Sequence, residues 1–543
     1  MPAIRPVDHL PTHDVINQPE PRGDVDLWAE DAVLRAAMAD AGADTAPLAE
    51  LGALLGREET RELGRTANRC LPELVLFDRA GRRLDEVRFH PAYHRLMEIG
   101  IGAGYAALPW EGAPGGHAAH AAMLYMFTQV EPGVCCPMTM TYAAVPALEA
   151  SPEVAREWRP RLLSRRYDGR SLPAAQKAGA TMGMAMTEKQ GGSDVRANTT
   201  RAEPDGDGLG WRLTGHKWFC SAPMSDAFLT LAQAPGGLTC FLVPRWTPEG
   251  ERNAIRLMRL KDKLGNRANA SAEIEYDRAW ALRVGEEGRG VRTIIEMVQH
   301  TRLDTGIAPA GLMRAALAEA RWWVEGRSAF QRRLIDQPLM RRVLADLVLD
   351  WEAVTRLAFR MARALDRAAD DAHDRALARV GIALAKFHGN KLCPGVIYEA
   401  MEVLGGMGFV EETPMPLLFR ESPLNSIWEG SGNVICLDVF RALAREPETR
   451  EALAAELDAA RGADRRYDAA LDEARALWPG LPEEGDGRIF TERMAELLAA
   501  SVLIREAPGP VADGYVATRL GGGRGRAYGT ARGLDEAALI ARI

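Results

Sequence analysis

One block of the sequence, in which polar and apolar residues alternate, most constrains how this chain of 543 residues can fold. The block runs from residue 183 to about residue 290, and turn residues recur within it. Segments 211–219, 228–232, 239–244 and 272–276 predict short strands, because alternation places apolar side chains on one face of a sheet. Long stretches with helical periodicity lie before and after the block. An α, β, α order of this kind predicts an α+β protein with a middle antiparallel β domain.

The helical parts of the chain differ in character. Residues 1–30 contain five prolines and predict an extended arm. Further along, the stretches 308–327, 338–370 and 374–404 are long and amphipathic. Helices of this length joined by short loops predict a bundle.

The last hundred residues form a separate segment rich in alanine and arginine. Helices are expected at 447–477 and 489–506, and the glycine-rich run 521–526 predicts a flexible tail. The sequence therefore divides into an N-terminal arm with an all-α domain (1–182), a middle antiparallel β domain (183–290), a helical bundle (291–445) and an appended helical domain (446–543).

Composition excludes several classes of protein. The net charge of -8 argues against binding of polyanions by the whole surface. Seven cysteines without a CxxC pair are typical of a reduced, cytoplasmic protein. No segment reaches eighteen consecutive apolar residues, so no membrane span is expected. The pairs His90–His94 and His117–His120 have spacings that suit a metal, but no third ligand stands nearby, so no metal site is expected.

The loop 184–194 carries two hydroxyl residues at its ends and glycines between them. Thr187 and Ser193 stand six residues apart, with Gly191 and Gly192 between. Glycines let the backbone approach a ligand closely, and hydroxyls can donate to a planar ring with acceptor atoms. The same residues are also typical of a solvated turn before a strand. On the local residues alone, the solvated turn is the favoured alternative.

The segment 425–433 places Glu429 just before a stretch with helical apolar periodicity at 434–440. Asn433 is a suitable N-cap for that helix, whose N-terminus and preceding glycines could hold an anionic group. Taken alone, Glu429 is more often a carboxylate that the helix dipole favours. If it lies in an apolar site, the same carboxylate is a good general base, since burial raises its pKa.

Together these segments resemble the acyl-CoA dehydrogenase family. Residues 187–194 match its T-E-x-x-x-G-S-D motif, and 429–431 match its E-G-S motif. Residues 402–409 resemble Q-x-x-G-G-x-G-F with Glu402 for Gln, and 327–331 resemble R-x-x-F-G with Gln in the last place. The family's W-I-T element resembles 218–220, where Cys replaces the hydroxyl residue.

This resemblance implies an FAD flavoprotein in which Glu429 removes the α-proton of an acyl thioester while a β-hydride passes to the flavin. It implies acyl-CoA or a related small thioester as substrate, and an electron-transfer acceptor. Because Arg327 would reach the FAD of a neighbouring subunit, it also implies a homodimer or homotetramer. The residues implied to bind FAD are Met184, Met186, Thr187, Gly192, Ser193, Trp218, Phe219, Cys220, Arg327, Gly405, Gly406, Ile427, Trp428, Gly430, Ser431, Gly432 and Asn433.

The proline-rich arm, the wording of the motifs and the additional C-terminal domain resemble the AidB-like branch of the family more specifically. That branch is associated with the response to DNA alkylation, and its C-terminal domain with binding of double-stranded DNA. The alternative function is therefore a DNA-binding protein that protects against or repairs alkylation damage and has weak or vestigial dehydrogenase activity. Residues 505–543 contain six arginines against four acids, and clustered positive charge is what phosphate binding needs. The candidate DNA contacts are Arg441, Arg445, Arg519, Arg524 and Arg526.

Overall fold

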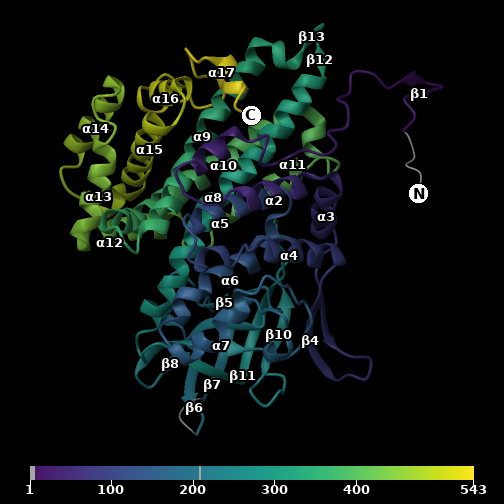
Figure 1. Cartoon of the computed structure of the whole chain (residues 1–543), viewed down its shortest axis with the longest axis vertical. Helices are drawn as coiled ribbons and strands as arrows, with labels where there is room; N and C mark the ends of the chain where they lie inside the picture. Colours follow the sequence, from purple (N-terminus) through teal and green to yellow (C-terminus); the bar gives the residue numbers. More distant parts are fainter. Residues whose placement is uncertain (1–5, 207–209) are drawn as a thin grey trace.

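The structure is a computed structural model that describes residues 6–206 and 210–543. In Figure 1 the β domain lies at the lower end, the long helices of the bundle run through the centre, and the appended helices lie at the upper left. One hydrophobic core runs through the N-terminal helices, the bundle and the appended helices, and a second, smaller core lies within the β domain. The predicted α+β class is confirmed.

The N-terminal part begins with an arm that carries a two-residue ladder, β1 (His9–Leu10) with β2 (His13–Asp14). A β-hairpin interrupts the helices and turns at residues 78–82. Its strands β3 (Glu73–Phe77) and β4 (Arg83–Arg88) pair antiparallel. The helices are α1 (Ala32–Met38), α2 (Ala46–Gly56), α3 (Glu58–Arg69), α4 (Pro91–Ala103), α5 (Gly116–Phe127), α6 (Cys135–Leu148) and α7 (Pro152–Leu162).

The middle domain is a sheet in which antiparallel pairs predominate. Strands β5 and β6 each pair with β8 in parallel, so the sheet is mixed at that strand. Strand β9 pairs antiparallel with both β8 and β11. The strands are β5 (Met182–Ala185), β6 (Arg201–Pro204), β7 (Gly210–Ser221), β8 (Ala227–Ala234), β9 (Gly237–Pro244), β10 (Ile255–Leu260) and β11 (Ser271–Val284).

The bundle consists mainly of α8 (Gly290–Gly326), α9 (Pro338–Arg367) and α10 (Ala372–Val403). The predicted helix 308–327 was too short, because α8 begins at Gly290. A hairpin of β12 (Ser328–Ala329) and β13 (Arg332–Arg333) joins α8 to α9. Beyond α10 lie the short helical turns η6 (Gly405–Phe409) and η7 (Leu424–Ser426), and the helices α11 (Met415–Glu421) and α12 (Gly432–Arg445).

The appended segment is more structured than the sequence predicted. The single helix expected at 447–477 is wrong: two helices form, and the break between them contains Gly462 with φ of 85°. The glycine-rich run 521–526 has no regular helix or strand, but Arg524 within it lies 3.4 Å from Asp350, and the Tyr528 hydroxyl just beyond it donates to the same carboxylate at 2.9 Å, so the chain here contacts α9. The elements are α13 (Pro447–Asp458), α14 (Arg465–Leu477), α15 (Gly487–Glu506), α16 (Gly509–Tyr515), a π-helical turn (Val516–Leu520) and α17 (Glu536–Ile540).

Across residues 6–206 and 210–543, none of the helices combines the length and the apolar character that a bilayer span requires.

Candidate active site

The carboxylate of Glu429 lies on the loop between η7 and α12, facing the middle of α8. Its Oε2 accepts a hydrogen bond of 2.7 Å from the Thr301 hydroxyl, and its backbone oxygen accepts one of 3.0 Å from Nε of Arg302. Burial raises the pKa of Glu429, while the Thr301 hydrogen bond and the charges of Arg302 and Lys386 act in the opposite direction. A carboxylate in these surroundings can act as a general base closer to neutral pH than an exposed glutamate.

The loop around Glu429 has an uncommon backbone conformation. Glu429 has φ of 56°, in the left-handed region that non-glycine residues rarely adopt, and Gly430 follows with φ of 104°. Nζ of the buried Lys386 donates to the backbone oxygens of Asn425 and Gly430, both at 2.8 Å. Burial, opposed by the Glu429 charge, lowers the pKa of Lys386 to about 7. The lysine therefore clamps both sides of the loop from α10.

An ion-pair network fixes the helices that surround this loop. Arg302 on α8 binds Asp438 on α12 at 2.8 Å, and Arg379 on α10 binds the same carboxylate at 3.1 Å. Both Arg302 and Asp438 are about nine-tenths buried, so solvent screens this pair weakly. The network holds α8, α10 and α12 together beside Glu429.

The helix that follows Glu429 begins earlier than predicted. Its N-cap is Ser431 and not Asn433, because α12 already starts at Gly432. The exposed Asn433 instead accepts a hydrogen bond of 2.9 Å from Arg488, which comes from α15 of the appended domain. Lys391 lies at the same end of the helix and donates to Ser426 at 2.9 Å. Two cations thus flank a helix N-terminus, where the free N–H groups and the helix dipole already favour an anion.

The glycine-containing loop at 187–193 is anchored by a buried ion pair. Nζ of Lys217 lies 2.8 Å from Oε1 of Glu188, and both side chains are fully buried. Although burial opposes ionisation, Lys217 and the neighbouring donors hold the pKa of Glu188 at about 2. The backbone amide of Trp218 donates to the backbone oxygen of Thr187 at 2.8 Å. Thr187 is partly exposed and Ser193 is exposed, so both hydroxyls remain accessible to a ligand.

The expected role of Cys220 is not compatible with its position. From Lys217 to Cys220 strand β7 advances three residues, whereas its partner β11 advances two, from Ala272 to Ile274. This β-bulge places the Cys220 side chain inside the sheet core, where its exposure is 0%. Phe219, on the outer face, is 47% exposed.

The hydroxyl on this face belongs to Ser221, which the sequence motif did not reveal. Ser221 is partly exposed, and its Oγ lies 3.3 Å from Oγ of Ser271. Burial raises the pKa of the Cys136 thiol to about 12, with Lys263 and the Ser221 hydroxyl opposing and Glu429 reinforcing the shift. Cys136 on α6 thus lies within the electrostatic reach of both Ser221 and Glu429.

The remaining residues predicted to bind FAD lie partly on the Glu429 loop and partly on other elements. Ile427 is 65% exposed, and the Trp428 indole donates to Asn425 at 2.7 Å. Gly405 and Gly406 lie on open surface, since a Cβ on either would meet no atom within 4 Å. Arg327 stacks on Trp323 at 4.7 Å and donates to Gln18 of the arm at 2.9 Å. Met184 and Met186 are partly buried on and after β5.

Two of the five arginines expected to contact DNA form ion pairs with carboxylates inside the protein. Arg519 is buried and binds Asp346 at 2.7 Å and Asp350 at 2.8 Å. Arg524 is mostly buried and lies 3.4 Å from Asp350. These two expectations are wrong, because a guanidinium held by buried carboxylates is not free for a phosphate. The other three arginines, at 441, 445 and 526, are exposed.

Comparisons with known proteins agree with the domain pattern of this geometry. The family model described as the adaptive response protein AidB N-terminal domain matches residues 17–169. The middle and C-terminal domain models of acyl-CoA dehydrogenases match residues 183–279 and 288–444. AidB of Escherichia coli (strain K12) is 46% identical over 514 residues, which cover 93% of this chain and 94% of that protein. The chain belongs to the acyl-CoA dehydrogenase family.

Solved structures share the fold over most of this chain. The structure of Caenorhabditis elegans ACDH-11 in complex with C11-CoA has a TM-score of 0.81 at 26% identity and covers 97% of this chain and 92% of that one. An acyl-CoA dehydrogenase from Bacillus anthracis complexed with FAD has a TM-score of 0.62 at 17% identity, with 79% and 77% covered. The resemblance to the AidB-like branch of the family is confirmed.

Proposed function

We propose that this protein is an FAD-dependent dehydrogenase of acyl thioesters, with Glu429 as the base that removes the α-proton. The observation that carries the proposal is the partly buried Glu429 carboxylate, because burial raises its pKa. Glu429 has a left-handed backbone, its oxygen accepts from Arg302, and the oxygen of the next residue, Gly430, accepts from Lys386. Such a carboxylate contributes a rate factor of roughly 10²–10⁴ when its proton acceptance is part of the slow step.

The residues around Glu429 suit FAD in the chemistry of their side chains. The exposed faces of Phe219 and Ile427 and the partly exposed Trp428 offer apolar surface to a planar ring. Lys391 and Arg488 at the start of α12 suit a pyrophosphate. Bound FAD would supply the acceptor for the β-hydride.

The chain's own residues divide the remaining work. Glu429 takes the α-proton, and the Thr301 hydroxyl orients its carboxylate by donating to Oε2. The Ser221 hydroxyl lies on the face of β7 that carries Phe219 and is a donor for a ring nitrogen or a carbonyl oxygen. Ser221 takes the place in this proposal that the sequence motif gave to Cys220.

The test is an anaerobic titration of the purified flavoprotein with short, branched and long acyl-CoAs, followed by the loss of oxidised flavin absorbance. Rapid bleaching by one chain class is expected from the natural sequence, and a decrease of at least about 10²-fold from Glu429→Gln. Glu50→Gln, at an exposed position on α2, is the matched control and retains the natural rate. Bleaching that persists in Glu429→Gln would refute the role of Glu429.

We further propose that the protein works as a homodimer or homotetramer. Phe330, at the tip of the β12–β13 hairpin, is 95% exposed, and it stands three residues from Arg327, the residue expected to reach a neighbouring subunit. An apolar side chain presented in this way suits burial against a second copy. Sedimentation velocity of the holoprotein measures the assembly, and a monomer at micromolar concentration would exclude it.

The alternative function, binding of double-stranded DNA, receives less support. Because Arg519 and Arg524 form buried ion pairs, only Arg441, Arg445 and Arg526 of the candidate set are exposed. Replacing these three by Gln and measuring the salt dependence of duplex binding would test the alternative without removing the appended domain. If they contact phosphates, the slope of log K against log salt decreases by about 0.9 for each arginine.

A further inference from the structure

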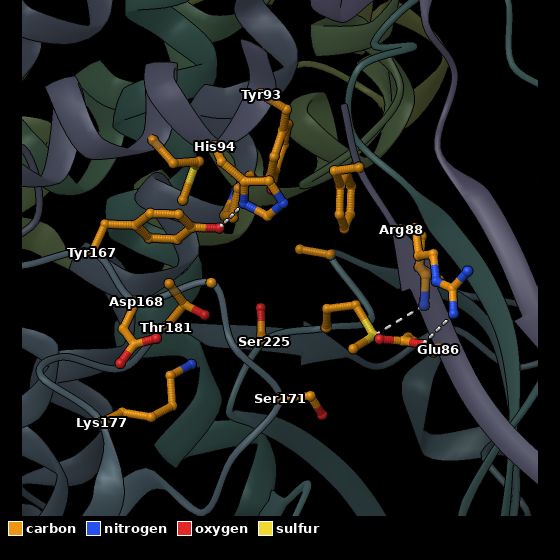
Figure 2. A pocket seen from close by; sticks show the side chains of 17 residues that line it. Glu86, Arg88, Tyr93, His94, Tyr167, Asp168, Ser171, Lys177, Thr181 and Ser225 are labelled. Carbon is orange, nitrogen blue, oxygen red and sulfur yellow. Dashed lines mark hydrogen bonds and ion pairs between the residues drawn. The ribbon is translucent and has the colours of Figure 1, made fainter. Parts of the chain in front are cut away.

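The protein has a cavity of about 280 Å³ (Figure 2), and none of the residues that line it has a role in the proposed function. It is formed where strand β4, helix α4, the loop 164–181 and the turn before β8 meet. Two of its lining residues, Pro137 and Ala222, are the chain neighbours of Cys136 and Ser221. The cavity therefore shares a wall with the candidate active site.

The charged side chains that line this cavity are already paired. Lys177 binds Asp226 at 2.6 Å, and both side chains are almost fully buried. Asp168 binds Arg170 at 2.6 Å, and Glu86 lies 3.4 Å from Arg88. An ionic ligand would have to disrupt these pairs or lie beside them without a partner of its own, so the charges favour a neutral ligand.

One polar group in the wall has no partner. Ser225 is 3% exposed, and its hydroxyl makes no hydrogen bond within residues 6–206 and 210–543. Figure 2 shows this hydroxyl pointing into the space between Tyr167 and Glu86. Buried hydroxyls nearly always have a hydrogen-bond partner, so an unpaired one that faces a cavity takes its partner from that cavity, either a water or a polar group of a ligand that displaces the water.

A second hydroxyl in the wall can accept a hydrogen bond. The Tyr167 hydroxyl lies 2.9 Å from Nδ1 of His94, and burial lowers the pKa of that imidazole, so the ring is neutral at pH 7. When Tyr167 donates to Nδ1, its oxygen still has a lone pair for an N–H donor. Gly169 is required at this point, since a Cβ there would come within 2.9 Å of both groups.

The remaining wall is apolar and limits the size of a ligand. Phe89 and Tyr93 stack with their ring centroids 4.2 Å apart, and Met97 and Met224 complete this side. At roughly 30 Å³ for each water in the liquid, the volume corresponds to about nine waters, or a ligand of about ten non-hydrogen atoms. The cavity is thus smaller than a site for a drug-sized molecule.

We propose that this cavity binds a small neutral molecule in which an apolar ring or chain carries an amide. Ser225 donates to the amide oxygen, the amide N–H donates to the Tyr167 oxygen, and the apolar part lies against Phe89 and the two methionines. Such an amide belongs either to a free metabolite or to the pantetheine arm of CoA, and the experiment below separates these two sources.

The probe for this site is benzamide, which has nine non-hydrogen atoms, titrated into the full-length holoprotein by calorimetry and by saturation-transfer NMR. We expect saturable binding in the millimolar range or tighter, and binding of benzoate at least about tenfold weaker because its charge has no partner. Ser225→Ala should weaken benzamide about five- to tenfold, the loss of one hydrogen bond. Ser328→Ala, at an exposed position, is the control and leaves the affinity unchanged.

Thermal unfolding is a second measurement, and it distinguishes a ligand-binding role of the Ser225 hydroxyl from a purely structural role. Because its hydroxyl has no protein partner, Ser225→Ala should melt at the natural temperature or above it without ligand, whereas a structural hydroxyl would lower the melting temperature. Ser225→Met, which fills the cavity, should abolish binding. Displacement of benzamide by CoA identifies the pantetheine arm as the source, and its absence identifies a free metabolite. No saturable binding at 10 mM benzamide, equal binding of benzoate, or an unchanged affinity in Ser225→Ala would each overturn the proposal.

Discussion

Glu429 and Lys386 act on each other through their charges. Burial raises the pKa of Glu429 and lowers that of Lys386 to about 7, and each charge opposes the shift of the other. When Glu429 accepts a proton, the charge that favours the Lys386 ammonium disappears, so the two groups titrate as a coupled pair. The protonation state of the base, Glu429, therefore depends on that of Lys386, which binds the backbone of the same loop.

Replacing Lys386 by Met tests this coupling. Flavin reduction by substrate should rise with pH as Glu429 loses its proton, and Lys386→Met should shift that rise to higher pH, because the ammonium that favours the carboxylate is gone. The variant also leaves the backbone oxygens of Asn425 and Gly430 without their donor, at a cost of about 1–3 kcal/mol in stability for each one that stays buried and unpaired. Stopped-flow reduction between pH 5 and 9 and urea denaturation measure the two effects.

The sign of the pH dependence of stability is opposite to that of an ordinary ion pair. The folded-state pKa of Lys386, about 7, lies below the ordinary lysine value of 10.5. Between these values the unfolded chain binds the extra proton, so the stability of the natural protein relative to Lys386→Met should rise as the pH rises from 7 to 10.5. Thr301→Val is the companion variant: it should also shift the kinetic profile upward, but without this dependence of stability. An unshifted profile in both variants would contradict the coupling.

The sequence predicts the base but not the residues that tune it. Glu429 stands in a contiguous motif, so its neighbours in sequence identify it. Thr301, Arg302 and Lys386 reach it from distant helices, and no local pattern marks them. Cys220 was assigned to the ligand face because strand alternation cannot foresee a β-bulge.

At the scale of elements, helix α12 connects the site to the appended domain. Its N-terminus lies three residues after Glu429, and Arg488 from α15 donates to Asn433 in its first turn. Lys391 from α10 flanks the same end, and burial together with the nearby Arg488 charge lowers its pKa. Two like charges held together in this way are stabilised when an anion lies between them.

Arg488→Gln tests whether the appended domain contributes to binding of the cofactor. The variant removes one charged hydrogen-bond donor from the proposed pyrophosphate seat and should weaken FAD about tenfold or more. Arg493→Gln is the matched control, since Arg493 lies on the same helix and pairs with Glu473 and Glu496. Its affinity for FAD should stay within a factor of two of the natural protein, as measured by quenching of flavin fluorescence. Equal affinities in the two variants would exclude Arg488 from the cofactor site.

The boundaries of elements follow the sequence where the apolar pattern is regular. Helices α9 and α10 begin and end within three residues of the predicted stretches. The first part of α8 did not show that pattern, because it carries buried polar residues such as His300, Arg302 and Asp304. These residues are polar because they bind partners inside the protein, so the segment that builds the site is the one that periodicity misses.

At the scale of the whole molecule, buried ion pairs join the appended domain to the bundle. Besides the bonds from Arg519 to Asp346 and Asp350, Arg542 near the C-terminus binds the fully buried Glu352 of α9 at 2.9 Å. The sequence could not predict these ion pairs, because their carboxylates lie far from the tail in the chain. A glycine- and arginine-rich tail alone is typical of a solvated segment. Cutting the chain at about residue 445 would remove the arginine partners of Asp346 and Asp350 and would leave Glu352 with Arg356 alone. Loss of an activity on such a truncation would therefore report on folding first.

Replacing Arg519 by Met measures how strongly this junction stabilises the fold. Removal of Arg519 leaves the buried Asp346 with the Gly529 amide, and leaves Asp350 with Arg524 and the Tyr528 hydroxyl. We therefore expect a cost of about 3 kcal/mol at pH 7, the lower end of the range for a broken buried pair. Although burial opposes it, Arg519 lowers the pKa of Asp350 below 3.8 in the folded state, so this pairing stabilises the protein above that pH and is lost as the pH falls through the folded value. The difference in unfolding free energy between natural protein and variant, measured by urea denaturation, should therefore persist from pH 7 to about pH 4 and narrow below that pH. Arg526→Met, at an exposed position of the same tail, should change stability by less than about 0.5 kcal/mol, and an equal loss in both variants would show that the tail does not depend on its buried pairs.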